Sequence, residues 1–475
     1  MEIVHISAEC YPVAKAGGLG DVAGALPKYL NQAGHIAKVL MPMYRTKFLY
    51  ANQWEVVHKG FTNLGNWWFE FTVIKEPLNV LGFDLYLLDI NGLLDREKVY
   101  GYDDDTERFT AFQIAALDWI ASWKHHPDLI HVHDHHTALI PFMLGNCYKY
   151  ANIRGIPTVM TIHNAEYQGW MGWDKIHYLP PWDTWNWGKL DWKNTVNPLA
   201  SGIKCADRVT TVSPNYLTEL TTMSNGLEDL FEYERGKCSG ILNGIDLDVW
   251  DPKTDTYLEH RFGIQQQEAG KAMNKASLCD EFQLDFDKPL LVFIGRLVGE
   301  KGADILPQVI RDAFYHIGRR MNFLILGSGN AAVEHELNQI KDIAQQDYNV
   351  YVGYHEGLSH RMYAGADFLL MPSRVEPCGL NQLYSMRYGT IPMVRRTGGL
   401  KDTVIDYGDA GGYGICYNHT AVGDVTHAIW RAVELYHDKS TLNYLRKEIM
   451  QLDFGWERST QDYIKLYEEV IFSRK

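Results

Sequence analysis

Two series of short apolar runs, separated by longer stretches with helical spacing, dominate the order of residues in this chain. The first series lies at residues 3–7, 37–41, 85–88, 129–132, 158–162 and 208–212, and the second at residues 290–294, 323–326, 350–352, 368–371 and 391–394. Continuously apolar strands that alternate with helices are typical of parallel sheets covered by helices on both faces. The sequence therefore predicts an α/β protein with two doubly wound domains.

The turn-rich stretch Leu242-Asn243-Gly244-Ile245-Asp246 marks the expected boundary between these domains. We expect one domain over residues 1–243, a second over 244–455, and a C-terminal helix over 456–475 that packs across the domains. Doubly wound sheets bind ligands beyond the carboxyl ends of their strands, at the point where the strand order reverses. Two facing domains of this kind would enclose an interdomain cleft lined by strand-to-helix loops.

Charge and cysteine content narrow the class of partner. The formal net charge of −14 disfavours nucleic acid and anionic membranes as partners, whereas a neutral polysaccharide would not be repelled. The 7 cysteines are scattered and include no C-x-x-C pair, which favours reduced thiols over disulfides or a zinc site. The N-terminus has the pattern of a strand rather than of a signal peptide, and no apolar run approaches the roughly 18 residues that span a bilayer. We therefore expect a cytoplasmic protein whose anionic ligands bind at local basic sites.

The first strand-to-helix loop, Lys15-Ala16-Gly17-Gly18-Leu19-Gly20-Asp21-Val22, is rich in glycine. Glycines let a backbone approach a ligand closely, and the N–H groups at a helix start favour phosphate. The spacing matches neither a dinucleotide-binding fingerprint nor a P-loop. Ligand binding and a merely tight turn therefore both remain interpretations of this loop.

Two loops of the second domain carry charges at strand ends. Arg296 and Lys301 follow the strand at 290–294, where both can reach one diphosphate, although a solvated basic loop would look the same. Glu376 follows the strand at 368–371, just before a helix expected near Gly379. A carboxylate there can accept hydrogen bonds from sugar hydroxyls, and a simple helix-capping acid is the alternative.

The run His131-Val132-His133-Asp134-His135-His136 resembles a metal cluster at first sight. In an extended strand, His131 and His133 share one face while Asp134 points away, and no second cluster with metal-ligand spacing accompanies them. We favour a strand-end loop with Asp134 near the substrate over a metal site. His163, just past the strand at 158–162, is expected near the same cleft.

The segment 167–192 holds eight aromatic residues, which suit either a lip that stacks on sugar rings or ordinary packing. Both interpretations stay open. These residues are Tyr167, Trp170, Trp173, Tyr178, Trp182, Trp185, Trp187 and Trp192.

Taken together, these stretches resemble the bacterial glycogen synthase and plant starch synthase family over essentially the whole chain. The order and spacing of the motifs carry the resemblance more than any single motif does. They are Glu9 with Lys15-Ala16-Gly17-Gly18-Leu19-Gly20-Asp21, Thr161-Ile162-His163-Asn164, Tyr167-Gln168-Gly169, Thr211-Val212-Ser213-Pro214, Leu242-Asn243-Gly244-Ile245-Asp246, Gly295-Arg296-Leu297, 373–380 and Arg395-Arg396-Thr397-Gly398-Gly399-Leu400.

The resemblance implies two facing Rossmann-like domains of the GT-B type, with the acceptor side in residues 1–243 and the nucleotide-sugar donor side in 244–455. It also implies a retaining glycosyltransferase that moves glucose from ADP-glucose to the non-reducing end of an α-1,4-glucan, with no metal and no other cofactor. Catalytic roles are expected for Lys15, Arg296, Lys301, Glu376, His163 and Asp134. Donor contacts are expected from Lys15, Gly18, Asn243, Arg296, Lys301, Tyr354 on the adenine, Glu376, Cys378, Gly379 and Leu380, and acceptor-side contacts from Glu9 and Asp21.

The chain departs from the relatives at three positions. Ala16 and Asn381 stand where threonine is common, and Tyr384 stands where many two-domain glycosyltransferases carry a second glutamate. The glycogen and starch synthase family lacks that second acid too, so Tyr384 fits it. A retaining enzyme with a UDP-sugar donor and another acceptor, and a non-catalytic glucan- or nucleotide-binding protein on the same fold, are the alternatives.

Overall fold

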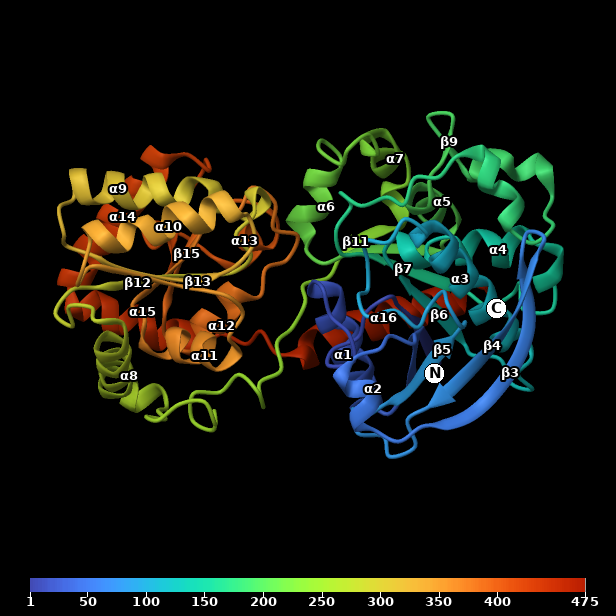
Figure 1. The fold of residues 1–475 in the computed structure, drawn as a ribbon, viewed down its shortest axis with the longest axis horizontal. Helices are drawn as coiled ribbons and strands as arrows, with labels where there is room; N and C mark the ends of the chain where they lie inside the picture. The colour runs from blue at the N-terminus through green and yellow to red at the C-terminus, as the bar shows by residue number, and fades with distance from the viewer. Residues whose placement is uncertain (475) are drawn as a thin grey trace. The chain divides into compact units, whose positions relative to one another are not determined.

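The computed structural model describes residues 1–474, which form two compact units, each with its own core (Figure 1). The N-terminal unit comprises Met1–Leu242 together with the last helix, and the C-terminal unit comprises Asn243–Gly455. Each unit contains a sheet covered by helices on both faces, so the predicted α/β class with two doubly wound units is confirmed. None of the helices within residues 1–474 has the length and apolar character that a bilayer crossing requires.

The sheet of the N-terminal unit runs, within residues 1–474, in the order β11-β10-β7-β6-β1-β2-β5-β4-β3. All neighbours are parallel except β3 with β4 and β4 with β5. The hairpin of β3 and β4 was not predicted, because its residues alternate between buried and exposed and form no continuous apolar run. The strands are β1 (Glu2–Ile6), β2 (Ile36–Pro42), β3 (Glu55–Leu64), β4 (Trp67–Lys75), β5 (Asp84–Asp89), β6 (Leu129–His133), β7 (Thr158–Ile162), β10 (Arg208–Thr211) and β11 (Cys238–Gly240), with β8 (Asp191–Trp192) and β9 (Thr195–Val196) as a separate antiparallel pair.

Two helices of this unit, α5 and α6, begin where the sequence supplies helix-start signals. Asn197 and Ser213 cap α5 and α6 with their side chains, and each helix has proline in its first turn, which needs no N–H there. The helices are α1 (Gly18–Gln32), α2 (Lys47–Ala51), α3 (Asp105–Ala121), α4 (Ile140–Asn146), α5 (Pro198–Cys205), α6 (Pro214–Leu220), α7 (Glu228–Tyr233) and α16 (Trp456–Arg474).

Helix α16 returns the chain to the N-terminal unit after the whole C-terminal unit has been traversed. Its buried Tyr463 and Tyr467 share a core cluster with Ile3 of β1 and Val22 of α1. The helix was expected to pack across the domains, and it packs into the core of the N-terminal unit.

The C-terminal unit has a parallel sheet in the order β14-β13-β12-β15-β16-β17, counted over residues 1–474. Alternate residues of β12 point to opposite faces: Phe293 joins the core beneath α9, α10 and α14, and Val292 joins the core beneath α8 and α11 (Figure 1). The strands are β12 (Leu290–Ile294), β13 (Asn322–Gly327), β14 (Tyr348–Val352), β15 (Phe368–Met371), β16 (Ile391–Arg395) and β17 (Ile415–Tyr417). The helices are α8 (Gln267–Phe282), α9 (Leu306–His316), α10 (Ala331–Ile343), α11 (Glu356–Gly365), α12 (Asn381–Arg387), α13 (Gly398–Thr403), α14 (Val422–His437) and α15 (Lys439–Gln451).

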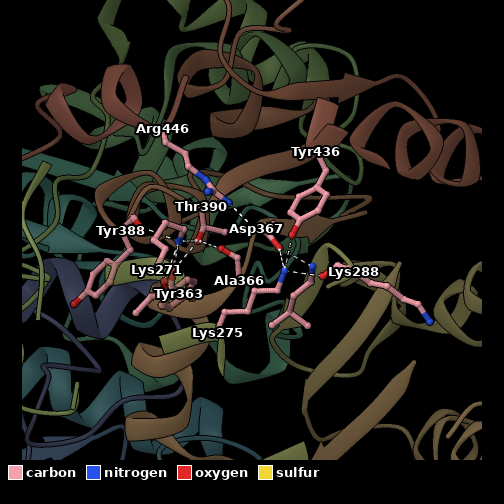
Figure 2. A network of polar contacts seen from close by, with 12 residues as sticks. Lys271, Lys275, Lys288, Tyr363, Ala366, Asp367, Tyr388, Thr390, Tyr436 and Arg446 are labelled. Carbon is pink, nitrogen blue, oxygen red and sulfur yellow. Dashed lines mark hydrogen bonds and ion pairs between the residues drawn. The ribbon is translucent and has the colours of Figure 1, made fainter. Parts of the chain in front are cut away.

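A buried network of charges ties the helices of this unit to the amino end of β15 (Figure 2). The Asp367 carboxylate pairs with Lys275 of α8 at 2.9 Å and with Arg446 of α15, and it accepts the N–H of Leu290 at 2.8 Å. Lys271 donates beside it to three backbone carbonyls and to Thr390. Asp367 directly precedes β15, so this network lies at the amino ends of the strands. The strand-to-helix loops leave from the carboxyl ends, and the network therefore has a structural role.

Candidate active site

The strand order places the glycine-rich loop and the Asp134 loop together in the N-terminal unit. Strand β1 pairs with β2 on one side and β6 on the other, so the order reverses at β1. The loops after β1 and β6 therefore leave the same edge of the sheet as neighbours, where doubly wound sheets bind ligands.

A buried carboxylate holds the glycine-rich loop. Glu9 accepts the backbone N–H groups of Ala16 at 2.6 Å and Gly17 at 2.9 Å through Oε2, and the Tyr100 hydroxyl at 2.6 Å through Oε1. Glu9 is only 3% exposed. These contacts show that Glu9 shapes the loop, and its expected contact with the acceptor stays a prediction.

The loop presents Lys15 and open backbone at the start of α1. The Lys15 ammonium lies 2.6 Å from Asp21 Oδ1, and the Lys15 side chain is 41% exposed. A Cβ atom added at Gly17 or Gly18 would meet nothing within 4 Å, so a ligand has room to approach the backbone there. The loop thus leaves room for a ligand, and ligand binding there stays a prediction.

Asp134 follows β6 with φ of 53°, a left-handed conformation that costs energy for a residue other than glycine. Its Oδ1 accepts the N–H of His163 at 2.7 Å and that of Asn164 at 3.4 Å. Burial raises the pKa of Asp134 to about 7, and Glu9 contributes in the same direction. The structure thus brings Asp134 and His163 together, as expected.

Three buried histidines, His5, His131 and His133, have nitrogen atoms within 4.8 Å of one another. Their arrangement does not suit a metal ion. The rings of His131 and His133 are stacked at 4.2 Å with 23° between their planes, and ring nitrogens bind metals in the ring plane. Both nitrogens of His131 already face hydroxyl groups, at 2.7 Å from Tyr467 and 2.6 Å from Thr161. The shared face of His131 and His133 was predicted, whereas the participation of His5 was missed because it lies far away in the sequence.

In the C-terminal unit the strand order reverses between β12 and β15, which pair directly. Their loops bring Lys301 and Glu376 together: the ammonium donates to both carboxylate oxygens, at 2.7 and 2.8 Å. Ser373 donates to the same carboxylate at 2.9 Å. Helix α12 begins at Asn381, and Glu376 does not cap it, so the helix-capping alternative was wrong. Ser373 was quoted within the motif but was not predicted as part of the site.

Arg296 extends from the same loop as Lys301 and is the more exposed of the two. Its side chain is 57% exposed, against 21% for Lys301, and its guanidinium lies 3.6 Å from Glu300. A backbone hydrogen bond joins this loop to the loop after β15, because the Glu300 carbonyl accepts the N–H of Arg374 at 2.8 Å. Lys301 is therefore held by Glu376 while Arg296 is largely exposed, and the binding of one diphosphate by both cations stays a prediction.

Cys378 lies two positions after Glu376 in the loop before α12, and Asn243 contacts it from a segment that is distant in the sequence. The backbone N–H of Asn243 interacts with the Cys378 thiol, whose pKa burial raises to about 12. The Asn243 Oδ1 atom is buried without a hydrogen-bond partner among residues 1–474. Gly379 has a left-handed φ of 74°, and Leu380 is the residue before α12. The chain therefore turns sharply just before this helix.

Tyr354, expected to pack on an adenine, follows β14 two positions after the last strand residue. Its side chain is 84% exposed. Because β14 is an edge strand, two strands from β12, Tyr354 lies at the same carboxyl edge as Arg296 and Lys301 but further along it.

The aromatic segment divides between packing and exposure. Trp182 packs on Phe142 with ring centroids 5.4 Å apart, and Trp192 donates to the Gly226 carbonyl at 2.8 Å. Trp185 and Trp187 are 92% and 56% exposed. Packing therefore accounts for Trp182 and Trp192, and stacking of the exposed Trp185 and Trp187 on sugar rings stays a prediction.

Comparison with known proteins agrees with this geometry along the whole chain. Residues 2–233 match the family model "Starch synthase catalytic domain", and residues 278–449 match "Glycosyl transferases group 1". The glycogen synthase of Flavobacterium johnsoniae is 54% identical over 471 residues, which cover 99% of both chains.

Solved structures show the same architecture. The catalytic domain of starch synthase IV from Arabidopsis thaliana, bound to ADP and acarbose, matches with a TM-score of 0.89 and 30% identity over 99% of both chains. Sucrose-phosphate synthase from Thermosynechococcus elongatus, at 16% identity and a TM-score of 0.65 over the full length of both chains, shares the GT-B fold. The chain is therefore a glycosyltransferase that belongs to the glycogen and starch synthase family.

Proposed function

We propose that the chain transfers glucose from ADP-glucose to the non-reducing end of an α-1,4-glucan, with retention of the anomeric configuration. The observation that carries the proposal is the Lys301–Glu376 pair at the strand-order reversal of the C-terminal unit. The pair sets a cation for phosphate beside a carboxylate for sugar hydroxyls. The names of the relatives, and the ADP and acarbose bound to the starch synthase, support this choice of donor and acceptor.

The donor side of the proposal rests on residues 244–455 and the preceding Asn243. Arg296 and Lys301 would neutralise the diphosphate, and Glu376 would accept hydrogen bonds from the glucose. The amides of Cys378, Gly379 and Leu380 and the side chains of Asn243 and Tyr354 complete the proposed donor contacts.

The N-terminal unit, residues 1–243 in this proposal, supplies the acceptor side. Lys15 and Gly18 would contact the phosphates of the donor from the glycine-rich loop. His163 and Asp134 would contact the transferred sugar. Glu9 and Asp21 would act at the acceptor, Glu9 through the loop that it holds.

In this reaction the protein stabilises developing charges and supplies no nucleophile of its own. The bond from the anomeric carbon to the diphosphate oxygen breaks, the acceptor hydroxyl oxygen bonds to that carbon, and its proton passes to the departing diphosphate. Negative charge grows on the leaving group, where Arg296 and Lys301 lower the barrier. The cationic sugar is stabilised by Glu376. Entry of the acceptor on the face that the diphosphate leaves retains the configuration.

A comparison of donors tests the proposal. When the glucose of ADP-glucose is labelled, we expect the label to enter glycogen and one ADP to be released for each transfer. An exo-acting hydrolase specific for α-1,4 linkages should remove the label again. A higher kcat/KM with UDP-glucose would favour the UDP-sugar alternative. Binding of the donor and glycogen without release of nucleoside diphosphate would favour the non-catalytic one.

We also propose that the protein works in the cytoplasm. Its seven cysteines are all unpaired in the structure, and burial raises the pKa of Cys10, Cys147 and Cys378, which keeps these thiols protonated. Measurement of seven free thiols in protein purified from the native cell without reductant would support this location.

A further inference from the structure

Three buried histidines from neighbouring strands form a row of hydrogen bonds that ends at His163. His5 Nδ1 lies 3.2 Å from His133 Nε2, and His133 Nδ1 lies 3.0 Å from His163 Nε2. His5 is in β1 and His133 in β6, which pairs with β1, while His163 follows β7, which pairs with β6. The row therefore crosses the sheet toward the site described above.

Both ends of the row are buried nitrogen atoms without a hydrogen-bond partner in the described part of the chain. They are His5 Nε2 and His163 Nδ1. His5 is 0% exposed and His163 is 7% exposed, and His163 also donates its backbone N–H to Asp134. A polar atom at this burial, beside the Asp134 loop, indicates a place for a ligand atom.

The row has a direction, because each neutral imidazole has one nitrogen that donates and one that accepts. Burial lowers the pKa of His5, His133 and His163, so all three rings are neutral near pH 7. If His5 Nδ1 donates to His133, then His133 Nδ1 must donate to His163, and the hydrogen of His163 must be on Nδ1. The opposite direction removes the hydrogen from His163 Nδ1 and places one on His5 Nε2.

The deep end of the row decides between the two directions. A buried N–H group without a partner is rarer in proteins than a buried acceptor without one. His5 Nε2 and His163 Nδ1 both lack a partner within residues 1–474, but His5 is fully buried, whereas His163 lies beside the Asp134 loop, where a substrate can supply an acceptor. The bare lone pair therefore belongs on His5 Nε2. The hydrogen of each ring is then on Nδ1, and His163 offers an N–H donor at the end of the row beside Asp134.

We propose that His5 and His133 are positioning residues that fix the tautomer of His163, so that its Nδ1–H donates to an oxygen of the bound substrate. The inference deepens the proposed glucosyl transfer and rests on it for the identity of that substrate. A donor held in place before the reaction needs no reorganisation as charge develops.

His131 stacks on this row but is not part of it. Its ring lies 4.2 Å from that of His133, yet its nitrogens face Tyr467 and Thr161. This neighbour supplies a matched control: Tyr467→Phe removes a buried hydrogen bond from a histidine beside the row and leaves the row intact.

The direct test is nuclear magnetic resonance of the whole protein with ¹⁵N-labelled histidine, which distinguishes protonated from bare ring nitrogens. We expect Nδ1 of His5, His133 and His163 to carry the hydrogen, with assignment by single substitution of each. A hydrogen on Nε2 of His163 would overturn the proposal. Because this measurement needs no turnover, it remains decisive if the chain uses another donor or acceptor than ADP-glucose and glucan.

A double-mutant cycle tests the effect on transfer. We expect His5→Leu to lower kcat roughly 3- to 10-fold, the range for one lost hydrogen bond, with little change in the KM for the donor. His5→Asn, which keeps a polar atom close to the position of Nδ1, should recover part of the loss. In a His163→Ala background, His5→Leu should have no further effect, because its action passes through His163.

Two outcomes of the cycle would contradict the proposal. One is an equal loss of kcat from His5→Leu with and without His163, since that would indicate a general structural effect. The other is a loss of kcat in Tyr467→Phe as large as that in His5→Leu. If a variant fails to fold, the tautomer measured in the unaltered protein decides.

Discussion

Burial shifts the pKa values of several side chains in the N-terminal unit. Burial lowers the pKa of eight histidines of this unit, and six of these are almost fully enclosed. The pKa falls to about 3 for His133 and to about 4 for His135, and that of Asp134 rises to about 7. The six are His5, His131, His133, His135, His136 and His163. These shifts couple the stability of the fold to pH.

We predict that the free energy of unfolding rises from pH 5 to pH 7. A histidine with a lowered pKa binds fewer protons when folded than when unfolded below pH 6.5, so protonation favours the unfolded chain as the pH falls. Each fully shifted group contributes at most about 1.4 kcal/mol per pH unit. Asp134 and Asp89, whose pKa values burial raises to about 7 and about 6, act in the opposite direction, but they are fewer.

Urea denaturation at pH 5, 6 and 7 measures this dependence. His136→Phe keeps a ring against Tyr100, which His136 stacks on at 4.5 Å, and should flatten the pH dependence. Equal midpoints at all three pH values, or a higher midpoint at pH 5, would contradict the prediction.

Site residues could be predicted from the sequence where each lies in the loop directly after a recognisable strand. Lys301 and Glu376 were expected at the site, and the structure joins them at 2.7 Å. Partners from distant segments could not be predicted. Tyr100 forms a hydrogen bond with Glu9, 91 positions away in the sequence, and His5 forms one with His133, 128 positions away. No spacing rule connects such residues before the strand order is known.

Among the elements, helix α13 supports the loop that contains Glu376. Gly398 has a φ of 45°, and its hydrogen faces the Glu376 carbonyl so closely that a Cβ atom would collide with that oxygen. The N–H of Gly399 donates to the same carbonyl at 3.1 Å. The glycine pair after β16 therefore sets the position of the loop after β15.

We predict that Gly398→Ala lowers kcat by about 10²-fold, because a shift of the reacting groups by about 1 Å costs this much. Gly423→Ala in α14 is the matched control, since an added Cβ there meets nothing within 4 Å. Steady-state transfer to glycogen measures both variants. Unchanged kcat in Gly398→Ala, or an equal loss in Gly423→Ala, would show that this packing does not matter.

Buried parallel strands were the elements easiest to predict. The runs at 158–162, 290–294 and 368–371 coincide with β7, β12 and β15, because both faces of these strands are covered. The hairpin of β3 and β4 was missed, since exposed polar residues such as Lys59 and Glu70 alternate with its buried residues and break the apolar runs.

As a whole molecule, the chain leaves the N-terminal unit at Leu242 and returns to it at Trp456. Helix α16 contributes Trp456, Tyr463 and Tyr467, each at most 2% exposed, to the core of that unit. The C-terminal unit, Asn243–Gly455, is continuous in sequence.

We therefore predict that a fragment of residues 243–455 folds alone, whereas a fragment of residues 1–242 does not. Loss of a buried aromatic side chain costs about 3–5 kcal/mol, and removal of α16 deletes three of them. Thermal unfolding followed by circular dichroism tests both fragments, with a peptide of residues 456–475 added to the second. A cooperative transition of the 1–242 fragment at the temperature of the whole protein would contradict this expectation.

We propose that Lys301, held against Glu376, stabilises the diphosphate as it leaves the sugar. The most direct measurement is kcat for Lys301→Ala with saturating ADP-glucose and glycogen, beside Lys288→Ala, whose lysine pairs with Asp347 away from the site. We predict a loss of about 10²- to 10³-fold for Lys301→Ala, the range for removal of one group that stabilises a transition state, and near-normal kcat for the control. A kcat for Lys301→Ala within twofold of the unaltered protein would show that this lysine does not stabilise the leaving group.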